Sequence, residues 1–104
     1  MSIGVHGFDW DEGNLEKCRK HGLSVAEIES LFSRPIDVLP DAAHSGTEER
    51  LKGIGRTDKG RYVLIVFTLR HVRKETLIRP ISARYMHKKE VDYYEEEIAK
   101  IKDR

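Results

Sequence analysis

The fold of this chain is decided by ten residues near its middle, RYVLIVFTLR at positions 61–70. Side chains alternate between the two faces of a strand, and here both sets are apolar apart from Thr68 and the two terminal arginines. A strand with two apolar faces is typical of the centre of a sheet that helices cover. The sequence therefore predicts a central strand over 61–70.

Turn signals flank this strand on both sides. Asp58-Lys59-Gly60 separates it from an alternating run over 48–56, which predicts a β-hairpin. A second turn over 71–75 leads to a further strand over 76–84. Pro80 lies inside that strand and has no N–H to donate, so we expect a bulge or an unpaired edge there. Connections this short predict antiparallel pairing.

Helix signals lie towards both ends of the chain. A first helix is predicted to begin at Asp11 or Asn14, since both residues suit the N-cap, and to end before Gly22. A last helix is predicted over 87–102, because its apolar residues recur at helical spacing.

The second helix has the clearest signals. Ser24 and Glu27 have the spacing of a capping box, and Pro35 prevents the helix from continuing. The apolar run over 36–39 is bounded by prolines and predicts an edge strand. A short first strand is predicted over 6–10.

These elements predict one domain over residues 1–104. Their order is β-α-α-β-β-β-β-α, and the expected fold class is α+β, a twisted antiparallel sheet flanked by helices. The chain is 38% hydrophobic and 36% charged, which is charge-rich but typical of a globular protein.

The cysteine content and the lack of targeting or membrane-spanning segments indicate the compartment of the protein. Cys18 is the only cysteine, so no disulfide can form within the chain, and this fits a reducing compartment. The N-terminus lacks the basic and apolar pattern of a signal peptide, and no apolar run could span a membrane. We therefore expect a cytoplasmic protein that needs no cofactor.

Positive charge is concentrated in the predicted sheet. Residues 50–89 contain twelve lysines and arginines but only two acidic residues, although the whole chain carries a net charge of +1. This distribution is typical of a surface that binds a polyanion. Solvated strand edges and hairpin tips are an equally acceptable interpretation.

The two-residue period of a strand sorts these cations by face. In the predicted strand over 48–56, Arg50, Lys52, Ile54 and Arg56 share one face. In the strand over 61–70, Val66, Thr68 and Arg70 share a face. In the strand over 76–84, Thr76, Ile78, Ser82 and Arg84 share a face. If the three faces coincide, several guanidinium groups gather on one side of the sheet and can bind phosphate. The alternative is that each arginine pairs with a nearby acid or covers a rim.

Such a surface could cleave RNA without a metal. The 2′-OH attacks the adjacent phosphate, a base takes its proton, an acid protonates the leaving 5′ oxygen, and cations stabilise the extra charge. The candidate proton carriers are His21, His44, Glu48, Glu49 and Tyr94.

Several of these residues have plainer interpretations. For His21 the alternative is a cap at the end of the first helix, and for Glu49 it is a structural ion pair. Cys18 and His21 are three positions apart and could supply at most half of a metal site. The plainer interpretation of Cys18 is a small buried thiol. Trp10 and Tyr62 could stack on bases, but core packing is the commoner role.

Five short motifs resemble the signature of BrnT-like toxins over residues 8–95. They are Phe8-Asp9-Trp10-Asp11-Glu12, Lys20-His21-Gly22-Leu23-Ser24, Glu48-Glu49-Arg50, Gly55-Arg56-Thr57 and Ile81-Ser82-Ala83-Arg84. The resemblance implies a fold similar to that of RelE-type toxins. It also implies a type II toxin that cleaves RNA and lowers translation, and a BrnA-like antitoxin, encoded nearby, that binds operator DNA.

The resemblance also implies the site residues. The expected catalytic residues are His21, Glu49, Arg56, Arg70 and Arg84. Further RNA contacts are expected from Arg50, Lys52, Arg61, Arg79 and Lys88. Two residues depart from the family pattern, Cys18 in the first helix and Pro80 in the strand that carries Arg84. Two other functions remain open, a binding module without enzymatic activity and, as the weakest, a metal hydrolase.

Overall fold

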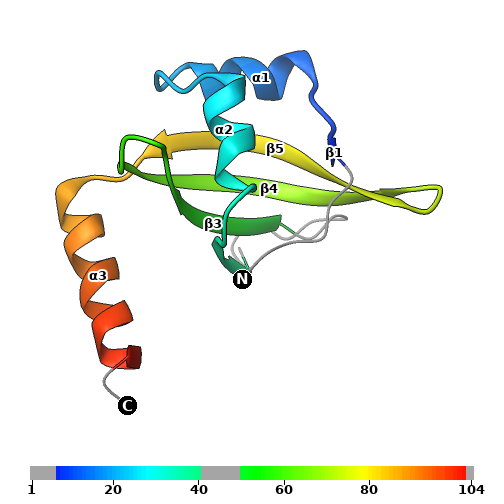
Figure 1. Ribbon diagram of the computed structural model, residues 1–104. Coiled ribbons are helices and arrows are strands. Elements are labelled where there is room, and N and C mark those ends of the chain that lie inside the picture. The colour runs from blue at the N-terminus through cyan, green and yellow to red at the C-terminus, as the bar shows by residue number, and fades with distance from the viewer. Residues whose placement is uncertain (1–6, 41–49, 103–104) are drawn as a thin grey trace.

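The computed structural model describes residues 7–40 and 50–102 (Figure 1). The element order within these ranges agrees with the predicted order. The elements are β1 (Gly7–Phe8), α1 (Glu12–Arg19), α2 (Val25–Leu31), β2 (Asp37–Pro40), β3 (Arg50–Arg56), β4 (Tyr62–Val72), β5 (Glu75–Tyr85) and α3 (Lys88–Lys102).

The strands form one sheet in the order β1-β5-β4-β3-β2, so the predicted central strand is indeed central. β2 to β5 pair antiparallel, as their short connections require. The prediction of a wholly antiparallel sheet is wrong at β1, which pairs parallel with β5. β1 and β5 are far apart in the sequence, so no hairpin dictates their relative direction. The α+β fold is consistent with the RelE-like arrangement.

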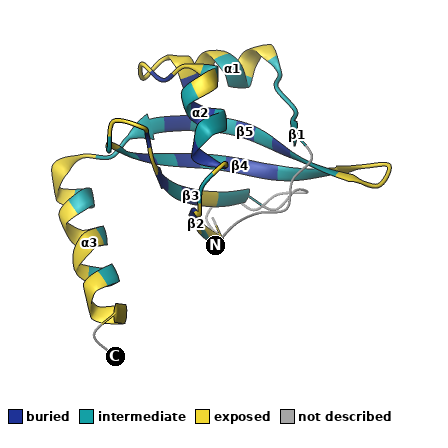
Figure 2. Ribbon diagram, in the orientation of Figure 1, coloured by how far each residue is buried: buried dark blue, intermediate teal, exposed yellow. Residues whose placement is uncertain are grey.

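Helices α1 and α2 cover one face of this sheet (Figure 1). The hydrophobic core lies beneath them, where Val63, Ile65 and Phe67 of β4 are fully buried (Figure 2). Phe32 follows α2 and meets the ring of Phe67 edge-on at 5.1 Å between centroids. Alternate residues of one strand thus fill one continuous core.

Local signals explain how the helices begin and end. Asp11 caps α1 by accepting a hydrogen bond from the backbone N of Asn14, and Gly22 adopts a φ of 87° beyond its end. Ser24 and Glu27 form the predicted capping box of α2. The predicted helix boundaries are therefore confirmed to within a few residues.

The open face of the sheet is the surface opposite α1 and α2. It carries Leu64 and Val66 of β4, which are only half-buried. Within the described residues, α3 is the one helix that approaches it, and no residue of α3 is buried. The prediction that helices cover both faces is therefore wrong for this face.

A β-bulge interrupts the pairing of β4 with β5, as Pro80 predicted. Val66 pairs with Ser82 and Phe67 with Pro80, so Ile81 is the extra residue. Beyond the bulge the alternation of faces is reversed. Arg84 therefore shares its face with Ser82 and Arg79, and the expectation that it also shares a face with Thr76 and Ile78 is wrong.

Candidate functional site

Strand register brings six basic side chains to the open face of the sheet. Residues that pair directly across antiparallel strands point to the same face. Arg56 pairs with Tyr62, Lys52 with Val66, Arg84 with Leu64 and Arg70 with Leu77, while Thr68 lies between Arg50 and Arg79. We call this set the basic face: Arg50, Lys52, Arg56, Arg70, Arg79 and Arg84.

The basic face has two ends. Arg56 and Arg84 flank Tyr62 and Leu64 on β4, and standard strand spacing puts their Cα atoms about 12 Å apart. Arg70 lies six residues further along β4 than Leu64, a separation of about 20 Å along the strand. The three predicted arginines therefore share a face, but Arg70 is not close to the other two.

At the Arg70 end, the cations are paired with acids from the segment that joins β1 to α1. Arg70 Nη1 lies 2.9 Å from Asp9 Oδ2, and Arg79 Nη1 lies 3.9 Å from the same oxygen. Arg79 also pairs with Asp11, the N-cap of α1. These contacts tie the start of the chain to the sheet, which is the structural interpretation of both arginines.

At the other end, Arg84 is held by the first turn of α3. Its Nη1 and Nη2 donate to the two carboxylate oxygens of Glu90 at 2.7 and 2.9 Å, and Nη1 lies 3.4 Å from the carbonyl oxygen of Tyr85. Hydrogen bonds from Arg84, and then from the backbone N of His87, lower the pKa of Glu90 to about 2. A guanidinium has five N–H donors, so this fixed group retains donors for a further acceptor.

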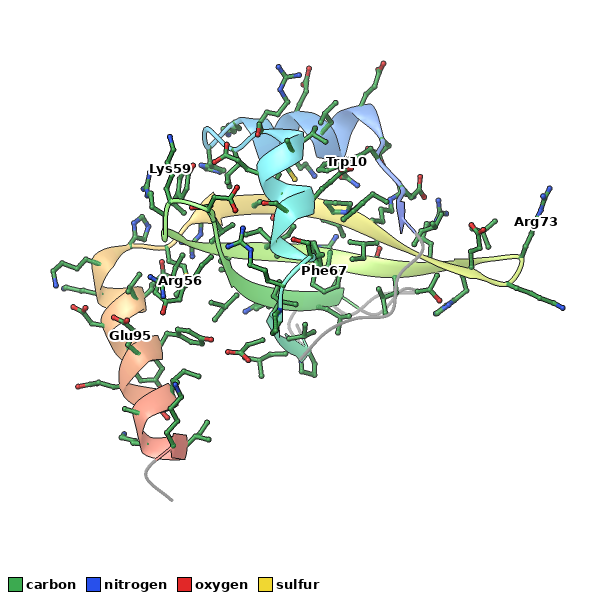
Figure 3. The ribbon with its side chains drawn as sticks, in the orientation of Figure 1. Trp10, Arg56, Lys59, Phe67, Arg73 and Glu95 are labelled. Atoms are coloured by element: carbon green, nitrogen blue, oxygen red, sulfur yellow. The ribbon has the colours of Figure 1, made fainter. Side chains whose placement is uncertain are left out.

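Arg56 is exposed at the end of β3 (Figure 3). Its guanidinium carbon lies 4.7 Å from the ring centroid of Tyr62, and its Nε and Nη2 donate to the carbonyl of Gly60 at 3.3 and 3.2 Å. The cation–π contact orients the guanidinium without neutralising its charge.

Tyr94 of α3 packs against the same region. Its ring meets the ring of Tyr62 edge-on, with centroids 5.5 Å apart, and its hydroxyl donates to the carboxylate of Asp37. Burial, and then the hydrogen bond to Asp37, raise the pKa of Tyr94 well above its usual value. The hydroxyl therefore stays protonated near neutral pH.

These residues surround a cleft of about 730 Å³. Its polar lining comes from Arg34, Asp37, Arg56, Tyr62, Tyr94, Glu95 and Lys102. Arg34 forms an ion pair with Asp58 in the β3–β4 turn. A hollow with cations and aromatic rings has the groups that bind phosphates and bases of single-stranded nucleic acid.

Several predicted site residues lie away from this cleft. His21 is exposed in the turn between α1 and α2, in the layer that covers the other face. The guanidinium of Arg61 stacks 3.6 Å from the ring centroid of Tyr85. Lys88 Nζ lies 3.0 Å from Asp92 Oδ2 at the start of α3. Glu49, like His44 and Glu48, lies outside the described residues.

The sequence analysis missed Arg34, Asp37 and Glu90. Each is an ordinary surface charge in the sequence, and each gains its place through contacts between separate elements. One signal was available for Asp37, since it is the polar residue within the apolar run of the edge strand.

The plain interpretation of Cys18 is confirmed. The side chain is fully buried, and burial raises the pKa of its thiol to about 11, which makes the thiol unreactive. Residues 7–40 and 50–102 contain no group of three or more His, Cys, Asp or Glu arranged to hold a metal ion. No helix in these ranges is long and apolar enough to cross a membrane.

Comparison with known proteins identifies the family to which this chain belongs. None of the curated proteins searched matches this chain. A family model described as "Ribonuclease toxin, BrnT, of type II toxin-antitoxin system" matches residues 10–90, which is most of the chain and includes Arg56, Arg84 and Glu90. Such a toxin is an endoribonuclease with RNA as its substrate and a cognate antitoxin as its partner. The match over most of its length, on a fold with a basic sheet face beside a cleft, means that this chain belongs to the BrnT family of ribonuclease toxins.

Proposed function

We propose that this chain cleaves RNA at the Arg56–Arg84 end of the basic face and thereby lowers translation. One observation carries the proposal. The register of β3, β4 and β5 brings these two arginines to one face, on the strands either side of β4, and Arg56 lines the cleft of about 730 Å³.

The proposed reaction needs no redox partner. The 2′-oxygen of one nucleotide bonds to the adjacent phosphorus, the bond from phosphorus to the 5′-oxygen breaks, and a 2′,3′-cyclic phosphate remains. One proton leaves the 2′-hydroxyl and one reaches the 5′-oxygen. Arg56 and Arg84 stabilise the added negative charge on the phosphate, and Glu90 is a positioning residue that holds the Arg84 guanidinium.

Glu49 is our proposed general base, and His21 is the alternative. The position of His21 in the helical layer over the other face weighs against it. Tyr94 is not suited to act as the base, because its raised pKa keeps the hydroxyl protonated and that hydroxyl donates to Asp37. Separate Glu49→Gln and His21→Gln variants distinguish the two bases, because only loss of the true base removes the acidic limb of the pH–rate profile, where protonation of the base lowers activity.

We assign flanking phosphates of the RNA to the remaining cations. Arg50, Lys52, Arg70 and Arg79 continue the basic face along the strands. Arg61 and Lys88 are weaker candidates, because both lie outside the basic face and contact Tyr85 and Asp92, respectively.

We further propose that the cognate antitoxin is BrnA-like, is encoded beside this chain and carries the contact to operator DNA. A type II toxin of this family acts with a protein antitoxin, which supports the proposal. We place the activity in the cytoplasm, where messenger RNA is translated. The single buried cysteine fits a reducing compartment.

The test is cleavage of a defined RNA by the purified chain in the presence of EDTA. We expect cleavage to survive EDTA and to be abolished in Arg56→Ala/Arg84→Ala. The matched control is Arg73→Ala/Lys74→Ala, which removes two positive charges at the far hairpin tip (Figure 3). Unchanged cleavage in the first double variant would overturn the site. Salt-sensitive binding of RNA that is never cut would favour a binding module.

A further inference from the structure

A second hollow lies beside the proposed site, between α3 and the open face of the sheet. It has a volume of about 580 Å³, and we call it the α3 groove. Its apolar lining comes from both sides, with Leu39, Ile54 and Leu64 on the sheet and Tyr93, Ile98 and Ile101 on α3. The groove is thus an apolar surface that the described residues leave uncovered.

Exposed hydrophobic side chains are concentrated at this groove. Leu39, Tyr93 and Ile101 are 58%, 66% and 63% exposed, and all three line it. The only other large hydrophobic residue of comparable exposure among the described residues is Val72, 48% exposed at the far end of β4. A contiguous apolar patch of this kind marks an interaction surface, whereas a single exposed residue does not.

The apolar stripe of α3 is left largely unburied, as is typical of a helix that contacts a partner. The helix has 15 residues, yet none is buried, even though it carries an apolar stripe. Tyr94 and Ile98 are among the α3 residues that line the groove. Four others, Glu90, Tyr93, Glu97 and Ile101, are three or four positions apart, so carboxylates alternate with apolar side chains along one line. Asp37 adds a third carboxylate on the sheet side.

This charge pattern selects among occupants. Among the described residues, the groove lining has three carboxylates and no lysine or arginine, so it disfavours a nucleic acid strand, whose phosphates are also negative. The carboxylates also disfavour a second copy of the chain docked groove to groove, since like charges would then meet. They favour a helical segment with an apolar face flanked by lysines or arginines.

We propose that the α3 groove docks an amphipathic, basic-flanked helical segment of the cognate antitoxin. Family membership establishes that such a protein partner exists. Leu64 lines the groove and pairs with Arg84, while Glu90 lines it and binds the Arg84 guanidinium. A helix seated there lies against the Arg84 end of the basic face and excludes RNA. This last step rests on the proposed function of Arg56 and Arg84.

Affinity for the purified cognate antitoxin, the product of the neighbouring gene, tests the groove directly. We expect Tyr93→Asp and Ile101→Asp each to weaken binding at least tenfold, with Val72→Asp as the matched control at wild-type affinity. Glu97→Lys should weaken binding several-fold, whereas Glu96→Lys, on the same helix but outside the groove lining, should not. Tyr93→Ala and Ile101→Ala replace any aspartate variant whose circular dichroism spectrum is not native.

RNA cleavage separates this proposal from the proposed function. The Tyr93 and Ile101 variants should cleave RNA at the wild-type rate but need at least tenfold more antitoxin for inhibition. Wild-type antitoxin affinity in both variants would overturn the groove assignment. So would a homodimer that these substitutions dissociate while antitoxin affinity stays unchanged. If the wild-type chain cleaves no RNA, the proposed function fails, and the affinity series still decides the groove.

Discussion

The two faces of the sheet differ in what covers them. On one face, α1 and α2 pack on Val63, Ile65 and Phe67, which are fully buried. On the open face, Leu64 and Val66 of the same strand are half-buried and lie among cations. Both sets are comparably apolar, so composition alone does not distinguish them. The difference teaches that one face supplies the stability of the fold while the other remains available for ligands.

The two ends of the basic face differ in the same way. Arg70 and Arg79 are tied to Asp9 and Asp11, which belong to the segment that crosses to α1. Arg56 lines the cleft and is held by the ring of Tyr62 and the carbonyl of Gly60. Arg84 is held by the carboxylate of Glu90. We therefore expect structural effects from substitutions at the first end and catalytic effects at the second.

The largest expected effect is the contrast between Arg84→Ala and Arg70→Ala in RNA cleavage. Removing a group that stabilises transition-state charge typically costs about 10²- to 10³-fold in rate, and we expect this for Arg84→Ala. Arg70→Ala should lower the rate less than about tenfold, because Arg70 is paired with Asp9 and lies about 20 Å along β4 from the Arg84 end. Initial rates on one RNA at fixed salt measure both. Equal losses would remove the distinction between the two ends.

The contrast between the faces is sharpened by Ile65→Ala and Leu64→Ala, which truncate neighbours on one strand. Ile65 is fully buried, so its truncation should lower the free energy of unfolding by about 3 kcal/mol. Leu64 is half-buried on the open face and should cost about 1 kcal/mol, since less apolar area returns to water. Urea denaturation of both variants measures the two losses. The interpretation of the open face fails if the Leu64 variant is as unstable as the Ile65 variant.

The smallest expected effect concerns acid pH and the pair of Glu90 with Arg84. In the folded chain the pKa of Glu90 is lowered from 4.5 to about 2, so its unfolded form binds a proton more readily. Its contribution to stability is therefore present above pH 4.5 and is lost as the pH falls towards 2. At pH 6 we expect the wild-type chain to have a higher Tm than the Glu90→Gln variant. This difference in Tm should disappear near pH 2. A constant difference across this range would mean that the ion pair does not stabilise the fold.

Prediction from the sequence succeeded where signals are local. The capping box at Ser24 and Glu27, the end of α1 near Gly22 and the bulge at Pro80 each depend on residues a few positions apart. It failed where distant segments meet. The parallel pairing of β1 and the contacts of Asp37 and Glu90 depend on which elements become neighbours.

The amino-acid sequence by itself determined the element order, the central position of β4 and the concentration of positive charge in the sheet, because propensity, spacing and charge are properties of short stretches. Which arginines share a face depends on the tertiary structure. A single extra residue in β5 reverses the alternation of faces, and so brings Arg79 and Arg84 to the same side although they are five positions apart. The fold likewise left the apolar line of α3 partly uncovered, since a helix buries its stripe only where another element is present to receive it.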